Sequence, residues 1–298
     1  MEIGFIGLGA MGLPMASNLA RKGFTVIGFD LDAGKMQSLA ALGARSAASV
    51  AEAAKAKDLV ITMLPATTHV MDVVLGERGV LANIGKQAVL MDMSTIDPKG
   101  TDAIASACAA KGVPFTDCPV GRLVLHAIKG ESLFMVGAAD ATFDRVKPAL
   151  DAMGTSIHRC GAPGMGSRMK IVNNFMLLVT AQVVSESLVL GTKLGLDVEI
   201  MKAVTGATTA NNAQFQVAFA NKVLKGDIEP GFTLDLTFKD LSLAMAAAAE
   251  HRIGLPVGAA AHAVVGQTRG SKYASKDFSA LLSYACDLAG VEQPRLKE

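Results

Sequence analysis

With 298 residues, the chain is long enough for two domains and a large buried core. Its 28 basic and 27 acidic residues give a net charge of +1, and no basic run marks it as a partner of nucleic acid or of an anionic membrane surface. Hydrophobic residues make up 51% of the chain, which indicates extensive burial and favours a subunit interface, so we expect a homodimer or homotetramer.

We also expect the chain to be neither a membrane protein, nor a metalloprotein, nor an exported protein. The most apolar long segment, residues 171–190, is interrupted by Asn173, Asn174, Gln182 and Glu186, so we expect no membrane span. The four cysteines and five histidines are scattered without metal-ligand spacing. No basic region precedes an apolar stretch at the start of the sequence, so we expect no signal peptide. A cytoplasmic protein with reduced thiols and no metal site is predicted.

The first thirty residues follow the order strand, glycine-rich turn, helix, strand and acid. An apolar run over Ile3–Leu8 predicts a strand buried on both faces, and it ends in a G-x-G-x-x-G motif. In such a turn the first glycine permits the bend, the second lets backbone approach a pyrophosphate, and the third lets the helix pack closely on the strand. The alternative is a purely structural glycine turn. We predict a dinucleotide-binding loop formed by Gly7, Leu8, Gly9, Ala10, Met11 and Gly12.

Asp30 ends the second predicted strand, Phe24–Phe29, and bears on the choice of dinucleotide. At this spacing from the glycines, an acid is placed to accept a hydrogen bond from the ribose 2′-hydroxyl. A carboxylate would also repel a 2′-phosphate, so NAD (as NADH) is favoured over NADP. Lys35 lies close enough in sequence to soften that preference.

The rest of the first half alternates between predicted strands and helices, which indicates a parallel, doubly wound sheet of the Rossmann type. Ligands of such sheets bind beyond the carboxyl ends of the strands. Leu64, Pro65 and Thr95 lie at two further strand ends and are predicted to bind the cofactor, with turn formation and helix capping as the competing interpretations. The predicted strands are Leu59–Leu64, Val89–Met93, Val113–Asp117, Ser132–Gly137 and Thr155–Arg159, and the predicted helices are Leu31–Leu42, Val50–Lys57, Thr67–Leu75, Pro98–Lys111 and Ala141–Ala152.

A glycine-rich linker at Gly161–Gly166 separates this half from an alanine-rich, helical second half. We therefore predict a dinucleotide-binding domain over residues 1–162 and an all-helical domain over residues 163–298, for substrate binding and oligomerisation. A long helix over Ser167–Leu194 is predicted to join them. The other predicted helices are Val198–Thr205, Asn212–Leu224, Leu234–His251, Val257–Arg269 and Phe278–Ala289.

Polar residues on the long helix are the first candidates for chemistry. Lys170, Asn173 or Asn174, and Leu177 fall at i, i+3 or i+4 and i+7, so they share one helix face. The competing interpretation of Lys170 is a solvated surface lysine. Lys239, followed by Asp240, is a second candidate, and its competing interpretation is a surface ion pair. Location favours a functional role, because pockets tend to form at domain junctions.

Arg122 is the third notable cation. It follows Gly121 just past the predicted strand that ends at Asp117. A guanidinium there could bind a carboxylate, sulfonate or phosphate bidentately, whereas an ordinary surface arginine is the alternative.

Taken together, these segments resemble the β-hydroxyacid dehydrogenase family, which includes 3-hydroxyisobutyrate dehydrogenase and tartronate semialdehyde reductase. The resemblance runs nearly end to end. It is carried by F-I-G-L-G-A-M-G-L-P-M-A-S-N-L near the start, M-S-T-I-D-P at Met93–Pro98, D-C-P-V at Asp117–Val120, G-x-G-x-x-x-K-x-x-N-N at Gly164–Asn174 and K-D-L at Lys239–Leu241.

The resemblance implies roles for individual residues. In that family, the lysine matching Lys170 is the catalytic acid/base, and the asparagine matching Asn174 orients the substrate. The lysine matching Lys239 lies near the nicotinamide, and the Thr95 position contacts the cofactor.

One loop departs from the family pattern. The family usually has P-V-S-G-G, whereas this chain has Pro119–Leu123 as P-V-G-R-L, which is similar to the sulfolactaldehyde reductase branch, also associated with succinate semialdehyde. In that branch the residues matching Arg122 and Asn173 hold the anionic end of the substrate, beside Gly121. Leu177 replaces a serine usual there, and Glu131 replaces a threonine; both changes weaken the case for sulfolactaldehyde itself.

The sequence thus predicts an NAD-dependent oxidoreductase that interconverts a short anionic aldehyde and its hydroxyacid. A 3-hydroxyisobutyrate dehydrogenase or tartronate semialdehyde reductase with an altered loop is the first alternative. A cofactor-binding regulator without catalysis is the remote one, and the presence of Lys170 argues against it.

Overall fold

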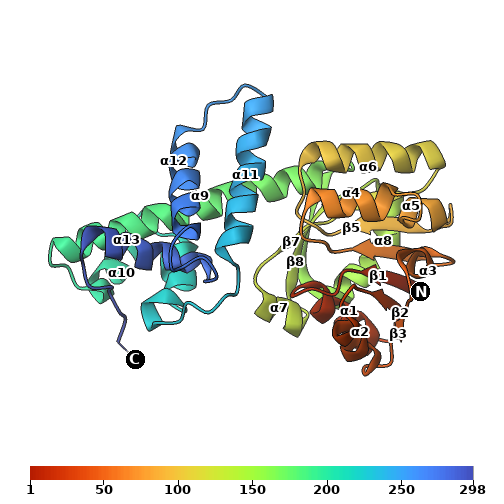
Figure 1. Cartoon of the computed structure of the whole chain (residues 1–298), viewed down its shortest axis with the longest axis horizontal. Helices are drawn as coiled ribbons and strands as arrows, with labels where there is room; N and C mark the ends of the chain where they lie inside the picture. Colours follow the sequence, from red (N-terminus) through yellow and green to blue (C-terminus); the bar gives the residue numbers. More distant parts are fainter. Residues whose placement is uncertain (298) are drawn as a thin grey trace. The chain divides into compact units, whose positions relative to one another are not determined.

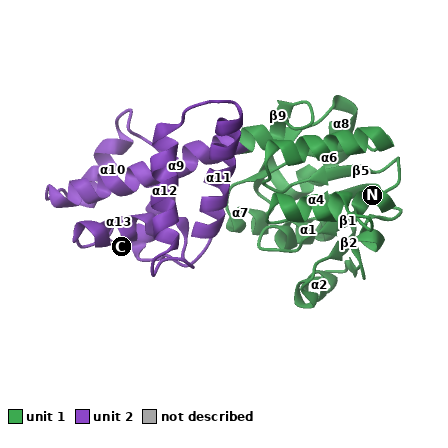
Figure 2. Ribbon diagram, turned by 45° about the horizontal axis from the view of Figure 1, so that its top comes forward, with its two compact units in different colours: residues 1–170 green, residues 171–298 purple. Residues whose placement is uncertain are grey.

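The computed structural model describes residues 1–297 and divides into two compact units. The first unit covers Met1–Lys170 and the second begins at Ile171, as the two colours of Figure 2 show. The division falls inside one continuous helix, α9 (Met165–Lys193), which begins two residues before the predicted long helix. Gly195 follows its end with a φ of 79°, a left-handed conformation that favours glycine and ends helices.

The first unit is built on a nine-stranded sheet (Figure 1) with the strand order β3-β2-β1-β4-β5-β6-β8-β7 and with β9 paired to β8. All pairs from β3 to β6 are parallel, which confirms the predicted Rossmann-type sheet. The strands are β1 (Glu2–Ile6), β2 (Thr25–Phe29), β3 (Arg45–Ser46), β4 (Leu59–Thr62), β5 (Val89–Asp92), β6 (Phe115–Asp117), β7 (Val120–Gly121), β8 (Ser132–Gly137) and β9 (Gly154–Gly161).

The far edge of the sheet is not parallel. Strand β8 runs antiparallel to both β6 and β7, and β9 then pairs parallel with β8. The short strand β7 was not predicted, because two residues after a proline carry no readable periodicity. The helices of this unit are α1 (Gly12–Arg21), α2 (Ala33–Ala40), α3 (Val50–Ala54), α4 (Thr67–Leu75), α5 (Val80–Asn83), α6 (Pro98–Lys111), α7 (Val124–Lys129) and α8 (Asp140–Met153).

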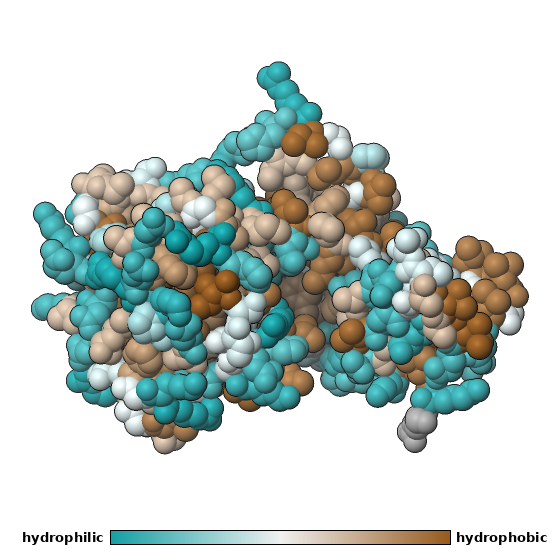
Figure 3. Space-filling model, turned by 180° about the vertical axis from the view of Figure 1, so that it is seen from behind, coloured by the Kyte–Doolittle hydropathy of each residue, from teal (hydrophilic) through white to brown (hydrophobic). Residues whose placement is uncertain are grey.

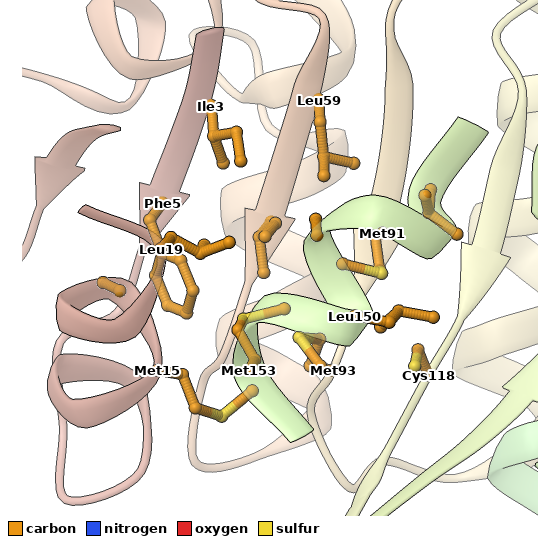
Figure 4. Packing of buried hydrophobic residues seen from close by; sticks show 14 of the residues in the cluster. Ile3, Phe5, Met15, Leu19, Leu59, Met91, Met93, Cys118, Leu150 and Met153 are labelled. Atoms are coloured by element: carbon orange, nitrogen blue, oxygen red, sulfur yellow. The ribbon is translucent and has the colours of Figure 1, made fainter. Parts of the chain in front are cut away.

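Side chains of the central strands alternate between two buried cores, one on each face of the sheet. Ile3 and Phe5 enter the core that Met15 and Leu19 of α1 cover, together with residues of α8 (Figure 4). Ile6 of the same strand packs in the other core, beneath α3, α4 and α6. Burial on both faces explains why these strands are continuously apolar in the sequence.

The second unit is helical around a single described core. Leu178, Ala181, Val184 and Leu188 of α9 enter this core, although α9 is also long and apolar enough to cross a membrane by length and composition. The predicted helix Asn212–Leu224 is replaced by a π-helical turn and a short 3₁₀ turn. The further elements are α10 (Val198–Gly206), η1 (Gln214–Phe219), η2 (Val223–Lys225), α11 (Leu234–Glu250), α12 (Pro256–Arg269), η3 (Phe278–Ala280) and α13 (Leu281–Ala289).

Candidate active site

The three glycines of the β1–α1 turn have three different environments. Gly7 has a φ of 96°, and a Cβ there would lie 2.3 Å from the Met63 carbonyl oxygen. A Cβ on Gly12 would lie 2.0 Å from the Gly7 carbonyl oxygen, so helix and strand are in direct backbone contact. A Cβ on Gly9 would meet nothing within 4 Å. The turn is therefore closed at both ends and open in the middle, which fits a loop whose backbone receives a pyrophosphate.

Helix α1 leaves its N-terminal end suited to an anion. Its N-cap is Met11, which makes no side-chain capping bond, and its first turn holds no acidic residue. The first N–H groups of a helix lack intrahelical partners and carry a partial positive charge, so phosphate groups are stabilised there. Loop and helix end together have the donor set that a dinucleotide requires.

Asp30 follows β2 and is tied to the glycine turn. Its Oδ2 accepts the Leu8 N–H at 2.6 Å, and its Oδ1 accepts the Asp32 N–H at 2.9 Å. The carboxylate is thus held beside the loop, half-buried, where the sequence places a ribose-binding acid.

The carboxyl ends of β4 and β5 are linked by polar side chains. The Leu64 N–H donates to Ser94 Oγ at 2.9 Å, and Ser94 Oγ donates to Asp92 Oδ1 at 2.6 Å. Thr62 Oγ1 donates to the same Asp92 oxygen at 2.7 Å. Burial raises the pKa of the Asp92 carboxyl to about 6, against these hydrogen bonds, which lower it. Pro65 and Thr95 adjoin this linked pair of strand ends.

Asp117, at the end of β6, holds the start of α9. Its two carboxylate oxygens accept the Gly164 and Ser167 N–H groups, each at 2.6 Å. A carboxylate at a helix N-terminus satisfies unpaired donors and complements the helix dipole. Burial nevertheless raises the pKa of this carboxyl.

Lys170 lies on the first turns of α9, half-buried. Its Nζ donates to the Val120 carbonyl oxygen at 2.7 Å, so the amine lies against β7. This hydrogen bond fixes the position of the amine, and its role in catalysis stays a prediction.

Arg122 follows β7 in an unusual backbone conformation. Its φ is 72°, in the left-handed region that favours glycine, and a non-glycine residue is strained there by about 1–2 kcal/mol. Its Nη1 donates to the Glu131 carbonyl oxygen at 2.5 Å and to Thr155 Oγ1 at 3.1 Å. Among residues 1–297, no hydrogen bond engages its Nη2 or Nε, so three of the five guanidinium hydrogens are available to an anion.

In the second unit, buried polar groups converge on Asn174. Its Nδ2 donates to Asp240 Oδ2 at 2.6 Å, and its Oδ1 accepts Asn173 Nδ2 at 3.0 Å. Asp240 also pairs with Lys239, whose Nζ lies 2.9 Å from Oδ1. Asn174 and Asp240 are each only 4% exposed, so the amide is held in one orientation. Leu177, one turn further on, packs partly buried against the helical core.

Sequence reasoning did not single out the acids that hold these groups. All three acids are almost fully buried: Asp92, Asp117 and Asp240. Each accepts a hydrogen bond from a candidate site residue or from a residue close to one in the sequence. The available signal was an acid at or next to the last position of a predicted buried strand, as for Asp117 and Asp92. Among residues 1–297, no cluster of three His, Cys, Asp or Glu side chains could hold a metal ion.

Comparison with known proteins agrees with this geometry. Residues 2–161 match the family model described as the NAD binding domain of 6-phosphogluconate dehydrogenase. Residues 164–285 match the model described as NAD-binding of NADP-dependent 3-hydroxyisobutyrate dehydrogenase. A glycine-rich dinucleotide loop on a parallel sheet, followed by a helical unit of this kind, defines an oxidoreductase with an NAD(P)-binding domain.

Individual relatives show which oxidoreductases the chain is similar to. The 3-sulfolactaldehyde reductase of Escherichia coli is 39% identical over 97% of both chains. The 2-(hydroxymethyl)glutarate dehydrogenase of Eubacterium barkeri is 36% identical over 98% of this chain and 97% of its own. The structure of Mycobacterium tuberculosis 3-hydroxyisobutyrate dehydrogenase with L-serine has a TM-score of 0.88 at 33% identity, over 95% of this chain and 98% of its own. The chain belongs to the β-hydroxyacid dehydrogenase family.

Proposed function

We propose that this protein is an NAD-dependent reductase of short anionic aldehydes, of the 3-sulfolactaldehyde or succinate semialdehyde type, and that it also catalyses the reverse oxidation. The observation that carries the proposal is the backbone conformation and the hydrogen bonding of Arg122. The family usually has a glycine at this position, and the left-handed backbone explains why. An arginine retained there against backbone strain, with three hydrogens available, supports a role in binding an anion.

The nicotinamide, when bound, would supply the hydride. Lys170 would donate the proton that the aldehyde oxygen needs on reduction and would accept it on oxidation. Asn174 would hold that oxygen by the amide hydrogen that Asp240 does not engage, because an amide nitrogen carries two hydrogens. Arg122, together with Gly121 and Asn173, would hold the anionic end. The protein's contribution is alignment and charge placement.

NAD is the proposed cofactor, because Asp30 lies beside the glycine loop as a carboxylate acceptor. Such a group favours a ribose hydroxyl and repels a 2′-phosphate. The second family model is named for an NADP-dependent enzyme, and the ratio of activities with NADH and NADPH tests the proposed preference. The four cysteines are free thiols, which supports the proposed cytoplasmic location.

A panel of aldehydes tests the substrate class. Sulfolactaldehyde, succinate semialdehyde, tartronate semialdehyde, methylmalonate semialdehyde and an uncharged aldehyde of similar length would be assayed with NADH, using the wild type and Arg122→Gly. Glycine suits the left-handed backbone, so stability should stay within about 1 kcal/mol of wild type. We expect Arg122→Gly to raise KM for sulfolactaldehyde and for succinate semialdehyde at least tenfold. KM for the uncharged aldehyde should stay within twofold.

The alternatives give different results in the same panel. If tartronate or methylmalonate semialdehyde is the best substrate and Arg122→Gly leaves its KM unchanged, the protein is a tartronate semialdehyde reductase or 3-hydroxyisobutyrate dehydrogenase with an altered loop. If NADH binds but no aldehyde is turned over, a regulatory role is favoured.

A homo-oligomer formed through the second unit is also proposed. Apolar side chains gather on the surface of this unit, at the right of Figure 3. Leu190 and Leu288, 61% and 69% exposed, line a groove of about 500 Å³ together with Glu186 and Lys193. A two-fold axis through this groove would bury the exposed leucines of two copies against each other. Light scattering should show at least a dimer, and Leu190→Glu should yield monomer with unchanged helical content; a monomeric wild type would contradict this.

A further inference from the structure

Asp92 joins the ends of two neighbouring strands through one oxygen atom. Strands β4 and β5 are paired with Thr62 opposite Asp92. Asp92 Oδ1 accepts the Thr62 hydroxyl at 2.7 Å, the Ser94 hydroxyl at 2.6 Å and the Ser94 N–H at 3.2 Å. Ser94 Oγ in turn accepts the Leu64 N–H at 2.9 Å. A side chain on β5 therefore reaches the backbone beyond β4 through a single serine.

The other oxygen of Asp92 has no partner. Asp92 is 1% exposed, and its Oδ2 is buried without a hydrogen bond among the described residues. A buried carboxylate that is only half satisfied disfavours folding, and the pKa of about 6 reflects that burial. Core packing alone would be better served by an apolar residue of similar volume. A purely structural account of Asp92 is therefore unsatisfactory.

We propose that Asp92 is a positioning residue for the dinucleotide: through Ser94 it fixes the backbone of Leu64 and Pro65, the strand end predicted to contact the cofactor. This inference rests on the proposed function, since it concerns the same cofactor site. Asp92 is buried, so its proposed effect on the cofactor is indirect. It acts by accepting the Ser94 hydroxyl hydrogen, which turns an oxygen lone pair of Ser94 toward the Leu64 N–H.

Local chemistry makes this link consequential. Pro65 has no N–H, so the residue after Leu64 cannot supply a second backbone hydrogen bond of the same kind. Without Asp92, the Ser94 hydroxyl has several rotational positions, and only some of them present a lone pair to Leu64. The strand end would then sample several positions, and the dinucleotide would have to order it on binding, which weakens affinity.

Cofactor binding by four variants tests the proposal. Binding of NADH is followed by the fluorescence of the directly excited nicotinamide and checked by calorimetry with NAD⁺. Asp92→Ala and Ser94→Ala should each raise the Kd for NADH about tenfold, as expected when a hydrogen bond to a charged group is lost. The Kd of the double variant for NADH should not exceed the higher of the two single-variant Kd values, because both residues act through one chain of hydrogen bonds. KM for the aldehyde should stay within twofold.

Thr62→Val is the matched control. It removes a buried hydrogen bond to the same Asp92 oxygen but leaves the link from Asp92 through Ser94 to Leu64 intact, so Kd for NADH should stay within twofold although stability falls. If Asp92→Ala does not fold, Asp92→Asn replaces it, with a smaller rise in Kd because the neutral amide oxygen is a weaker acceptor.

The outcomes separate the two levels of inference. If the wild type binds neither NADH nor NADPH, the proposed function fails and this inference fails with it. If the wild type binds NADH and the Asp92 and Ser94 variants bind it equally well, only the positioning role is overturned. Additive losses in the double variant would also overturn it.

Discussion

The Nζ of Lys170 donates to the carbonyl oxygen of Val120 at 2.7 Å. Val120 belongs to β7, the short strand that ends at Gly121 and leads directly into the strained Arg122. The predicted acid/base and the predicted anion-binding residue are therefore linked through two residues of backbone within the first unit. The two residues that carry the proposed chemistry and the proposed substrate selection therefore share one short segment of backbone.

Lys170→Ala should remove most of the turnover. General acid–base catalysis by a positioned side chain contributes about 10²- to 10⁴-fold, so kcat should fall by that factor. The Kd for NADH should stay within twofold, because the glycine loop and Asp30 are untouched. Steady-state kinetics and a cofactor titration measure the two quantities. Lys147→Ala, at an exposed lysine that pairs with Asp151, is the control; a Lys170→Ala enzyme with the kcat of that control would remove Lys170 from the mechanism.

Asp92 should make stability depend on pH. Its pKa is about 6 in the fold against 3.8 for an ordinary carboxyl, so the native state binds the proton more tightly than the unfolded chain. The free energy of unfolding should therefore decrease as pH rises from about 4 to about 6, by about 3 kcal/mol, and level off above.

Asp92→Asn isolates that contribution. The pKa of Asp117 is raised in the same direction, so the wild type retains some slope from this second carboxyl. Urea unfolding at several pH values should show wild type losing more stability than Asp92→Asn between pH 4 and 6. Parallel curves for the two proteins would show that Asp92 ionises normally in the fold.

The sequence predicted the strands well because their side chains are buried on both faces, and a continuous apolar run such as Leu59–Thr62 has few other interpretations. It did not reveal the left-handed conformation of Arg122, because an arginine does not signal a positive φ as glycine does. The partners of Asn174 were also hidden, because Asp240 lies on another helix and only packing of α11 against α9 brings the two together. Residue types were readable, whereas long-range hydrogen bonds were not.

Asp240 should matter for the chemical step. Asp240→Ala leaves the Asn174 amide without its acceptor and Lys239 without its carboxylate, so the amide can rotate away from the substrate oxygen. We expect kcat to fall about tenfold or more, since small misplacements of an orienting group are costly in rate. Asp240→Asn retains an acceptor for Asn174 and should lose less.

Asp235→Ala is the control for this helix. Asp235 lies on α11 one turn before Lys239, but it is exposed and pairs with Arg269, whereas Asp240 is buried against Asn174. Its variant should keep wild-type kcat. If Asp240→Ala and Asp235→Ala have the same kcat, the buried hydrogen bond does not serve catalysis.

Asp30 should decide between the two dinucleotides. Asp30→Asn keeps an acceptor oxygen beside the glycine loop and removes only the charge that repels a 2′-phosphate. The ratio of kcat/KM with NADH to kcat/KM with NADPH should therefore fall about tenfold or more. Asp32→Asn is the control, because Asp32 caps α2 through the Gly34 N–H and should leave the ratio within twofold. The Nζ of Lys35 lies 3.9 Å from Asp32 Oδ2. This amine would attract the 2′-phosphate of NADPH once the Asp30 charge is gone. Adding Lys35→Ala to Asp30→Asn should reverse part of the gain with NADPH. An unchanged ratio in Asp30→Asn would mean that the carboxylate serves only the Leu8 and Asp32 N–H groups and does not select the cofactor.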